Sequence, residues 1–138
     1  GVAPLRLSDV QKENLKAYVE GGGLLLADAA GGGRPFAESF TKMATETIGP
    51  LAPAIPPFTR EVTDPRNRVM MRYLGRVPRG LRPLEVLANR DDRGRYRVLF
   101  VPVDLTAALV GYPGVDASGL TPASAQAFVT ALLKSTMN

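Results

Sequence analysis

Two glycine triplets enclose a short apolar run in residues 21–36, GGGLLLADAAGGGRPF, and this stretch constrains the fold of the 138-residue chain most. A short apolar run between glycines is typical of a strand buried on both faces. The preceding residues, 8–20, predict a helix, because Ser8 suits the N-cap and Gln11 completes a capping box. Glycines 21–23 then end this helix, since glycine adopts a left-handed conformation at little cost. The stretch therefore predicts a helix, a glycine stop, a buried strand and a sharp turn.

Helices and strands alternate along the rest of the chain. Residues 35–48 predict a helix that begins near Pro35, and residues 121–138 predict a last helix capped by Thr121. Residues 83–90 and 95–104 predict strands, and the DDRG sequence between them indicates a hairpin. Residues 68–74 are a further short strand candidate. The expected buried faces are Val10, Leu15, Tyr18 and Val19 in the first helix, Phe36, Phe40, Met43 and Ile48 in the second, and Ala125, Phe128, Val129, Leu132 and Leu133 in the last.

Two regions predict irregular structure. Residues 49–68 contain five prolines, which interrupt helices and are disfavoured in central strands. Residues 105–119 read as a loop with at most one helical turn. With these regions as connections, the alternation predicts a single three-layer α/β domain over residues 1–138 with a mainly parallel sheet.

Two aspartates follow predicted strands directly: Asp28 ends LLLAD and Asp104 ends FVPVD. Ligands of parallel α/β sheets bind beyond the carboxyl ends of the strands, so both are candidate catalytic residues. A carboxylate there can act as a nucleophile or general base, and a pair can hold a hard divalent cation. The structural alternative is that each aspartate accepts backbone hydrogen bonds at a turn or helix start.

The chain contains no cysteine and no histidine. It therefore cannot use Ser-His-Asp or Cys-His catalysis. It also lacks the ligands that zinc and copper prefer, so we predict no such metal site, and no motif indicates a cofactor.

The glycine loop at residues 31–33 lacks the lysine and hydroxyl of a nucleotide phosphate loop and the third glycine of a dinucleotide-binding turn. Its backbone amides suit either an anion-binding nest or a flexible connection between strand and helix. The candidate ligand-binding residues are thus Asp28, Ala29, Gly31, Gly32, Gly33, Arg34 and Asp104.

Basic residues gather in the middle of the chain: eleven arginines but only five acidic residues lie between Arg60 and Arg97. This region suits either a solvated surface or an anion or nucleic-acid contact. Tyr73 and Tyr96 are its only aromatic residues between Phe58 and Phe100. Few bases could therefore stack, which argues against nucleic acid as the partner. No apolar run is long enough to span a membrane.

Several phrases together resemble the bacterial domain of unknown function 4159 family, which has the class I glutamine amidotransferase-like, flavodoxin-like fold. They are Tyr18-Val19-Glu20, Gly22-Gly23, Leu25, Asp28, Gly31-Gly32, the helix from Phe36 to Phe40, and RYRVLFVPVDLTAALVGY at 95–112. The resemblance covers most of the chain. It implies that Asp28 stands where amidotransferases place the nucleophilic cysteine of their elbow.

The chain departs from the family pattern in two ways. Relatives carry a His-Pro pair before an aromatic residue, and the matching stretch here is Ile55-Pro56-Pro57-Phe58. Relatives also begin with additional βα units, so we expect this chain to be the C-terminal part of a longer bacterial protein. The resemblance leaves open whether that protein is membrane-anchored and whether the domain is cytoplasmic or periplasmic.

The empty elbow favours a non-catalytic domain that binds a ligand or protein partner of unknown identity. The alternative is a hydrolase in which Asp28 and Asp104 use a divalent cation. A weaker third hypothesis is a nucleic-acid contact through the arginine-rich region, with an affinity that falls steeply with salt.

Overall fold

The computed structural model describes residues 3–30, 33–54, 73–74, 86–111 and 119–136. These residues form a mixed α/β domain with four helices, a four-stranded sheet and a separate two-stranded ribbon. The helices are α1 (Asp9–Glu20), α2 (Arg34–Thr47), α4 (Leu105–Val110) and α5 (Pro122–Thr136). The strands are β1 (Leu25–Asp28), β2 (Ala52–Pro53), β3 (Tyr73–Leu74), β4 (Leu87–Arg90), β5 (Tyr96–Val101) and β6 (Gly119–Leu120).

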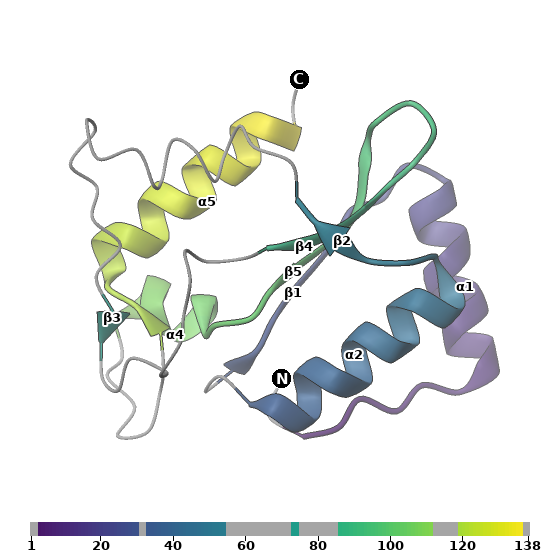
Figure 1. The fold of residues 1–138 in the computed structure, drawn as a ribbon, viewed down its shortest axis with the longest axis horizontal. Helices are drawn as coiled ribbons and strands as arrows, with labels where there is room; N and C mark the ends of the chain where they lie inside the picture. The colour runs from purple at the N-terminus through teal and green to yellow at the C-terminus, as the bar shows by residue number, and fades with distance from the viewer. Residues whose placement is uncertain (1–2, 31–32, 55–72, 75–85, 112–118, 137–138) are drawn as a thin grey trace.

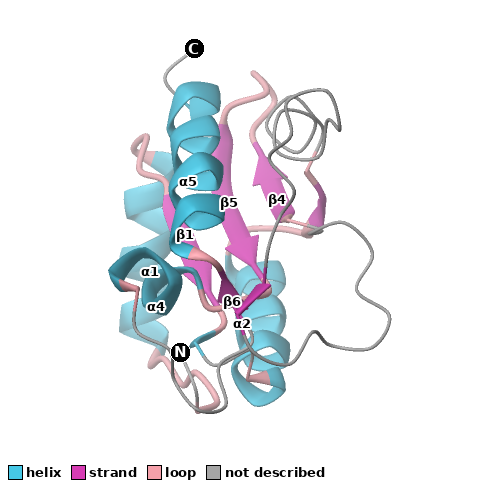
Figure 2. Ribbon diagram, turned by 90° about the vertical axis from the view of Figure 1, so that its left-hand side faces the viewer, coloured by secondary structure: helices cyan, strands magenta, loops and turns pink. Residues whose placement is uncertain are grey.

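Helices cover both faces of the four-stranded sheet. Figure 1 shows the sheet edge-on, with α4 and α5 on one side and α1 and α2 on the other. Figure 2, turned by 90°, places α5 in front of the strands and β1 at one edge. The described part of the chain therefore has the three layers that the alternating pattern predicts.

The strand order is β1-β5-β4-β2. β1 pairs in parallel with β5, whereas β4 is antiparallel to both of its neighbours, β5 and β2. The predicted hairpin at DDRG is thus confirmed, but the prediction of a mainly parallel sheet is wrong. The reason is the short connection itself, since a tight turn joins antiparallel neighbours and a parallel pair needs a long crossover.

A β-bulge interrupts the hairpin. Asn89 pairs with Val98, but the next residue, Arg90, pairs with Tyr96, which leaves Arg97 as the extra residue. A bulge sets two residues opposite one and breaks the alternation of side chains. As a result Tyr96 lies in the apolar cluster on the α5 side, while Val98 lies in the cluster on the α2 side.

Each face of the sheet has its own apolar core. On one face, Phe128 and Leu132 of α5 pack against Leu99 and Val101 of β5. On the other face, Phe40 of α2 stacks on Phe100 of β5, with 5.1 Å between ring centroids. The central strand β5 therefore contributes to both cores.

The sequence predicted several buried positions that are exposed. Val10 and Tyr18 of α1 are 65% and 57% exposed, and Leu133 of α5 is 54% exposed. β1 is not buried on both faces either, because Leu26 is 44% exposed. In α1 only Val19 is fully buried.

The predicted helix boundaries are largely confirmed. Ser8 and Gln11 form the capping box of α1, with bonds of 3.3 Å and 2.9 Å, and the Thr121 hydroxyl accepts a bond from the Ser124 amide at the start of α5. In the glycine stop it is Gly22 that takes the positive φ, at 110°.

Two connections differ from the prediction or lie outside it. Residues 105–110, expected as loop, form α4. Residues 49–54 include the short strand β2, and the predicted strand at 68–74 is described only at 73–74.

Candidate functional site

Asp28 is the last residue of β1 and faces the first turn of α4. Its Oδ2 atom accepts hydrogen bonds from the amides of Leu105 and Thr106, at 3.0 Å and 2.9 Å. The Thr106 hydroxyl donates a third bond to the same oxygen, at 3.0 Å. The side chain that the sequence singled out as a candidate nucleophile therefore accepts bonds from the beginning of a helix.

Asp104 has a similar position. It follows β5 and is the N-cap residue of α4, where its Oδ1 atom accepts a bond from the Ala107 amide at 2.8 Å. The side chain is buried. Helix N-termini have amides without intrahelical partners, and aspartate is among the preferred residues for satisfying them.

The parallel pairing of β1 and β5 brings the two candidates together. Asp28 lies opposite Val101, three residues before Asp104, so both carboxylates reach the same end of α4. Using Asp28 Oδ2 as a nucleophile or metal ligand would require breaking three internal hydrogen bonds. The geometry favours the structural role that the sequence left open as an alternative.

Thr106 is a site residue that the sequence analysis missed. Its hydroxyl and amide both bind Asp28. The signal was present, since a threonine two residues after a potential N-cap aspartate suits the first turn of a helix. It was overlooked because residues 105–119 were expected to be a loop.

The other candidate ligand-binding residues lie at the start of α2. Ala29 is buried, and its amide donates to the Val101 carbonyl at 3.1 Å. Gly33 is the N-cap residue of α2, and its amide donates to Ala30. Arg34 is exposed and forms an ion pair with Glu38 at 2.7 Å. Gly31 and Gly32 lie outside the described residues, and so does the core of the proposed anion nest.

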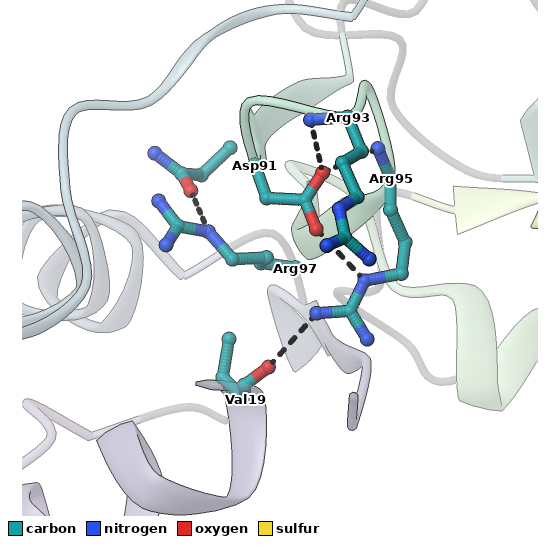
Figure 3. Close-up of polar contacts among 6 residues, drawn as sticks. Val19, Asp91, Arg93, Arg95 and Arg97 are labelled. Atoms are coloured by element: carbon teal, nitrogen blue, oxygen red, sulfur yellow. Dashed lines mark hydrogen bonds and ion pairs between the residues drawn. The ribbon is translucent and has the colours of Figure 1, made fainter. Parts of the chain in front are cut away.

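The β4–β5 hairpin contains the described part of the arginine-rich region. Figure 3 shows that Arg95 binds Asp91 through its Nε atom at 3.0 Å and the Val19 carbonyl through Nη2 at 3.4 Å. Val19 lies in the last turn of α1, where a cation is favoured by the helix dipole. Arg95 thus connects the hairpin to α1.

Asp91 is the acceptor at the centre of this turn. The amides of Arg95 and Arg93 both donate to its Oδ1 atom, at 2.9 Å and 3.0 Å. The bond from the Arg95 amide is the largest influence that lowers the pKa of Asp91 below its usual value of 3.8, and the Arg95 side chain and the Arg93 amide lower it further.

Two further arginines also have partners within the protein. Arg97 donates from Nε to Asn89 Oδ1 at 2.8 Å, and Asn89 donates from Nδ2 to the Pro50 carbonyl at 2.8 Å. Arg90 lies over the ring of Tyr96, 4.0 Å from its centroid, and hydrogen-bonds the Tyr96 hydroxyl. These contacts give the hairpin arginines structural roles. The arginines between residues 60 and 82 lie outside the described residues.

Within the described ranges, no three Asp, Glu, His or Cys side chains gather in a way that could hold a metal ion. No helix among the described residues has the length and apolar character needed to cross a membrane. In comparisons with known proteins, no family model, curated protein or solved structure matches the chain.

Proposed function

We propose that this chain is a non-catalytic binding or interaction domain on a flavodoxin-like scaffold of the class I glutamine amidotransferase type. The observation that carries the proposal is the hydrogen bonding of Asp28 and Asp104 to the same helix start. The elbow at which an amidotransferase would hold its nucleophile thus holds a side chain that stabilises α4. The absence of cysteine and histidine from the sequence supports the same conclusion.

The scaffold part of the proposal is supported by the order of elements at the elbow. A helix ends at glycines, a strand runs beside the central strand in parallel, and a helix follows immediately. The antiparallel β4 and β2 add to this unit at one side of the sheet.

The alternative reading, a cation-dependent hydrolase, makes a different prediction for Asp28. If Asp28 is structural, Asp28→Ala removes the acceptor of three bonds and should lower the free energy of unfolding by about 1–3 kcal/mol. Asp28→Asn keeps an acceptor oxygen and should cost less. Asp92→Asn, at an exposed turn position, is the matched control and should stay within about 0.5 kcal/mol of the parent. Urea denaturation measures all three.

The same proteins test for a cation site. Melting temperatures are recorded with Mg²⁺, Mn²⁺ or Ca²⁺ added separately, and hydrolysis of p-nitrophenyl phosphate is assayed in each case. We expect any cation to shift the parent and Asp28→Asn equally. A cation-dependent rise in the melting temperature and a hydrolytic rate that both disappear in Asp28→Asn would overturn the proposal, because a ligand that binds only the folded state stabilises it by mass action.

A further inference from the structure

The two outer strands of the sheet are built differently. β2 is only two residues long and contains Pro53, which has no N–H to offer to a neighbour. Short length and proline are features by which proteins protect sheet edges from further pairing. β1 has neither proline nor bulge, and the run Leu24 to Ala27 has no charged residue. Within the described residues β1 has no neighbour on its outer side (Figure 2).

The outer edge of β1 is centred on Leu26. The Ala29 amide donates to Val101 of β5, and backbone groups alternate in direction along a strand. Ala27 and Leu25 therefore also direct their backbone groups to β5, whereas the N–H and C=O of Leu26 point away from it. The Leu26 side chain is 44% exposed although Leu99, its partner on β5, is fully buried. The edge thus presents outward-facing polar backbone groups beside an exposed apolar side chain.

We propose that this edge pairs antiparallel with β1 of a second copy of the chain, about a two-fold axis at Leu26. The two four-stranded sheets would then join into one. This inference rests on the proposed function as an interaction domain and names its surface and its partner. Edge-strand addition supplies backbone hydrogen bonds as the main attraction.

The strand is complementary to itself in this register. A two-fold axis at Leu26 sets Leu26 opposite Leu26, and Leu24 opposite Asp28, so that outward-facing residues meet outward-facing residues. No like charges oppose each other, which would be unfavourable in a cross-strand pair. The Asp28 carboxylate also binds the start of α4 through its Oδ2 atom.

The same symmetry places both copies of α1 on one face of the joined sheet. This follows because a two-fold axis perpendicular to a sheet keeps each helix on its own side, and α1 lies opposite α5 (Figure 1). Val10 and Tyr18 give α1 exposed apolar surface. The second copy therefore meets a polar backbone edge together with apolar side chains, as closed two-fold interfaces require self-complementary patches.

Light scattering after size exclusion gives the first test. We expect a concentration-dependent mass of twice the 14.7 kDa chain. Leu26→Lys should shift this mass to the monomer, because it sets two lysines opposite each other at the axis. Val110→Lys is the control, since Val110 is 74% exposed on α4, and it should remain dimeric. Circular dichroism confirms that both variants are folded.

A cysteine cross-link tests the register. The chain has no cysteine, so Leu26→Cys introduces a single thiol. Directly opposed residues of a hydrogen-bonded antiparallel pair have Cα atoms about 5.5 Å apart, within the range of about 4.4–6.8 Å that disulfides bridge. We expect oxidation to link Leu26→Cys into dimers at least tenfold faster than Val110→Cys.

Three results would overturn the inference. They are a monomeric mass at every concentration, a dimer that Leu26→Lys leaves intact, and equal cross-linking rates of the two cysteine variants. A monomer would assign the β1 edge to another polypeptide or to no partner, and would leave the proposed function standing. A cation-dependent hydrolytic rate lost in Asp28→Asn would instead remove the proposed function without touching the dimer.

Discussion

Asn89 connects two parts of the chain that are far apart in sequence. It is 7% exposed, and its amide group receives a bond from Arg97 while donating to the Pro50 carbonyl. The β-bulge makes the first bond possible, because it leaves Arg97 as the unpaired extra residue of β5. A single buried amide therefore ties the segment after α2 to the central hairpin.

Removing this amide should be costly. We expect Asn89→Ala to lower the free energy of unfolding by about 1–3 kcal/mol, since a buried carbonyl and a guanidinium both lose their partner. Arg97→Met in the same background should cost less than it does alone, and urea denaturation of the four proteins measures this coupling. Additive losses would show that the Asn89–Arg97 bond contributes nothing. Arg93→Met, at an exposed position, is the control.

Asp91 gives the hairpin a pH dependence. The Arg95 amide, as the first cause, holds the pKa of Asp91 below 3.8. A carboxyl group whose pKa is lower in the folded than in the unfolded state stabilises the fold above the unfolded pKa, and loses this contribution as the pH falls through the folded pKa. Asp91→Asn should therefore reduce stability at pH 7, and the difference from the parent should shrink below pH 3.8.

Carbon-13 detection of the carboxyl titration measures the Asp91 pKa directly, and denaturation at several pH values measures its consequence. Asp92→Asn changes the neighbouring turn residue and should give no such pH dependence. A stability difference between the parent and Asp91→Asn that is constant down to pH 2 would contradict the assignment.

At the scale of elements, α1 depends on few contacts. Of its twelve residues only Val19 is fully buried, and its start is held by the Ser8–Gln11 capping box. Short helices are only marginally stable in water without tertiary packing. Val19 and the bond from Arg95 to the Val19 carbonyl therefore fix the end of this helix to the domain.

Two valines of α1 provide a matched pair. Val19→Ala should cost about 1.5–3 kcal/mol, because it removes two buried methyl groups at about 0.8 kcal/mol each and leaves a cavity. Val10→Ala makes the same chemical change at a side chain that is 65% exposed, and should stay within about 0.5 kcal/mol. Thermal or urea denaturation compares them. Equal losses would contradict the packing of α1 described above.

Local signals in the sequence predicted individual elements well. The capping box, the DDRG hairpin and the cap at Thr121 all involve residues within a few positions of each other, so their chemistry is visible in the sequence. The exposed faces of α1 and α5 were not predictable in the same way. Periodicity places Val10, Tyr18 and Leu133 near an apolar stripe, but which part of a stripe is covered depends on the neighbouring elements.

At the scale of the whole molecule, the sequence predicted helices on a sheet but not the arrangement of its strands. The hairpin pattern conflicted with a mainly parallel sheet, and the short turn decided the outcome. The site shows the same limit. Asp28 and Asp104 were recognisable as strand-end residues, but their common attachment to α4 depends on the pairing of β1 with β5, which are separated by more than sixty residues in sequence.

The parallel pairing of β1 and β5 also determines when the domain can begin to form during synthesis. Leu25 to Asp28 cannot pair until Val98 to Val101 have been made, because these are their partners. Until then the ribosome has released an apolar strand with two unpaired edges, and contacts between distant residues form slowly. The nascent chain therefore passes through a stage in which β1 is exposed to aggregation, and α2, the next element to be completed, can shield only one of its faces.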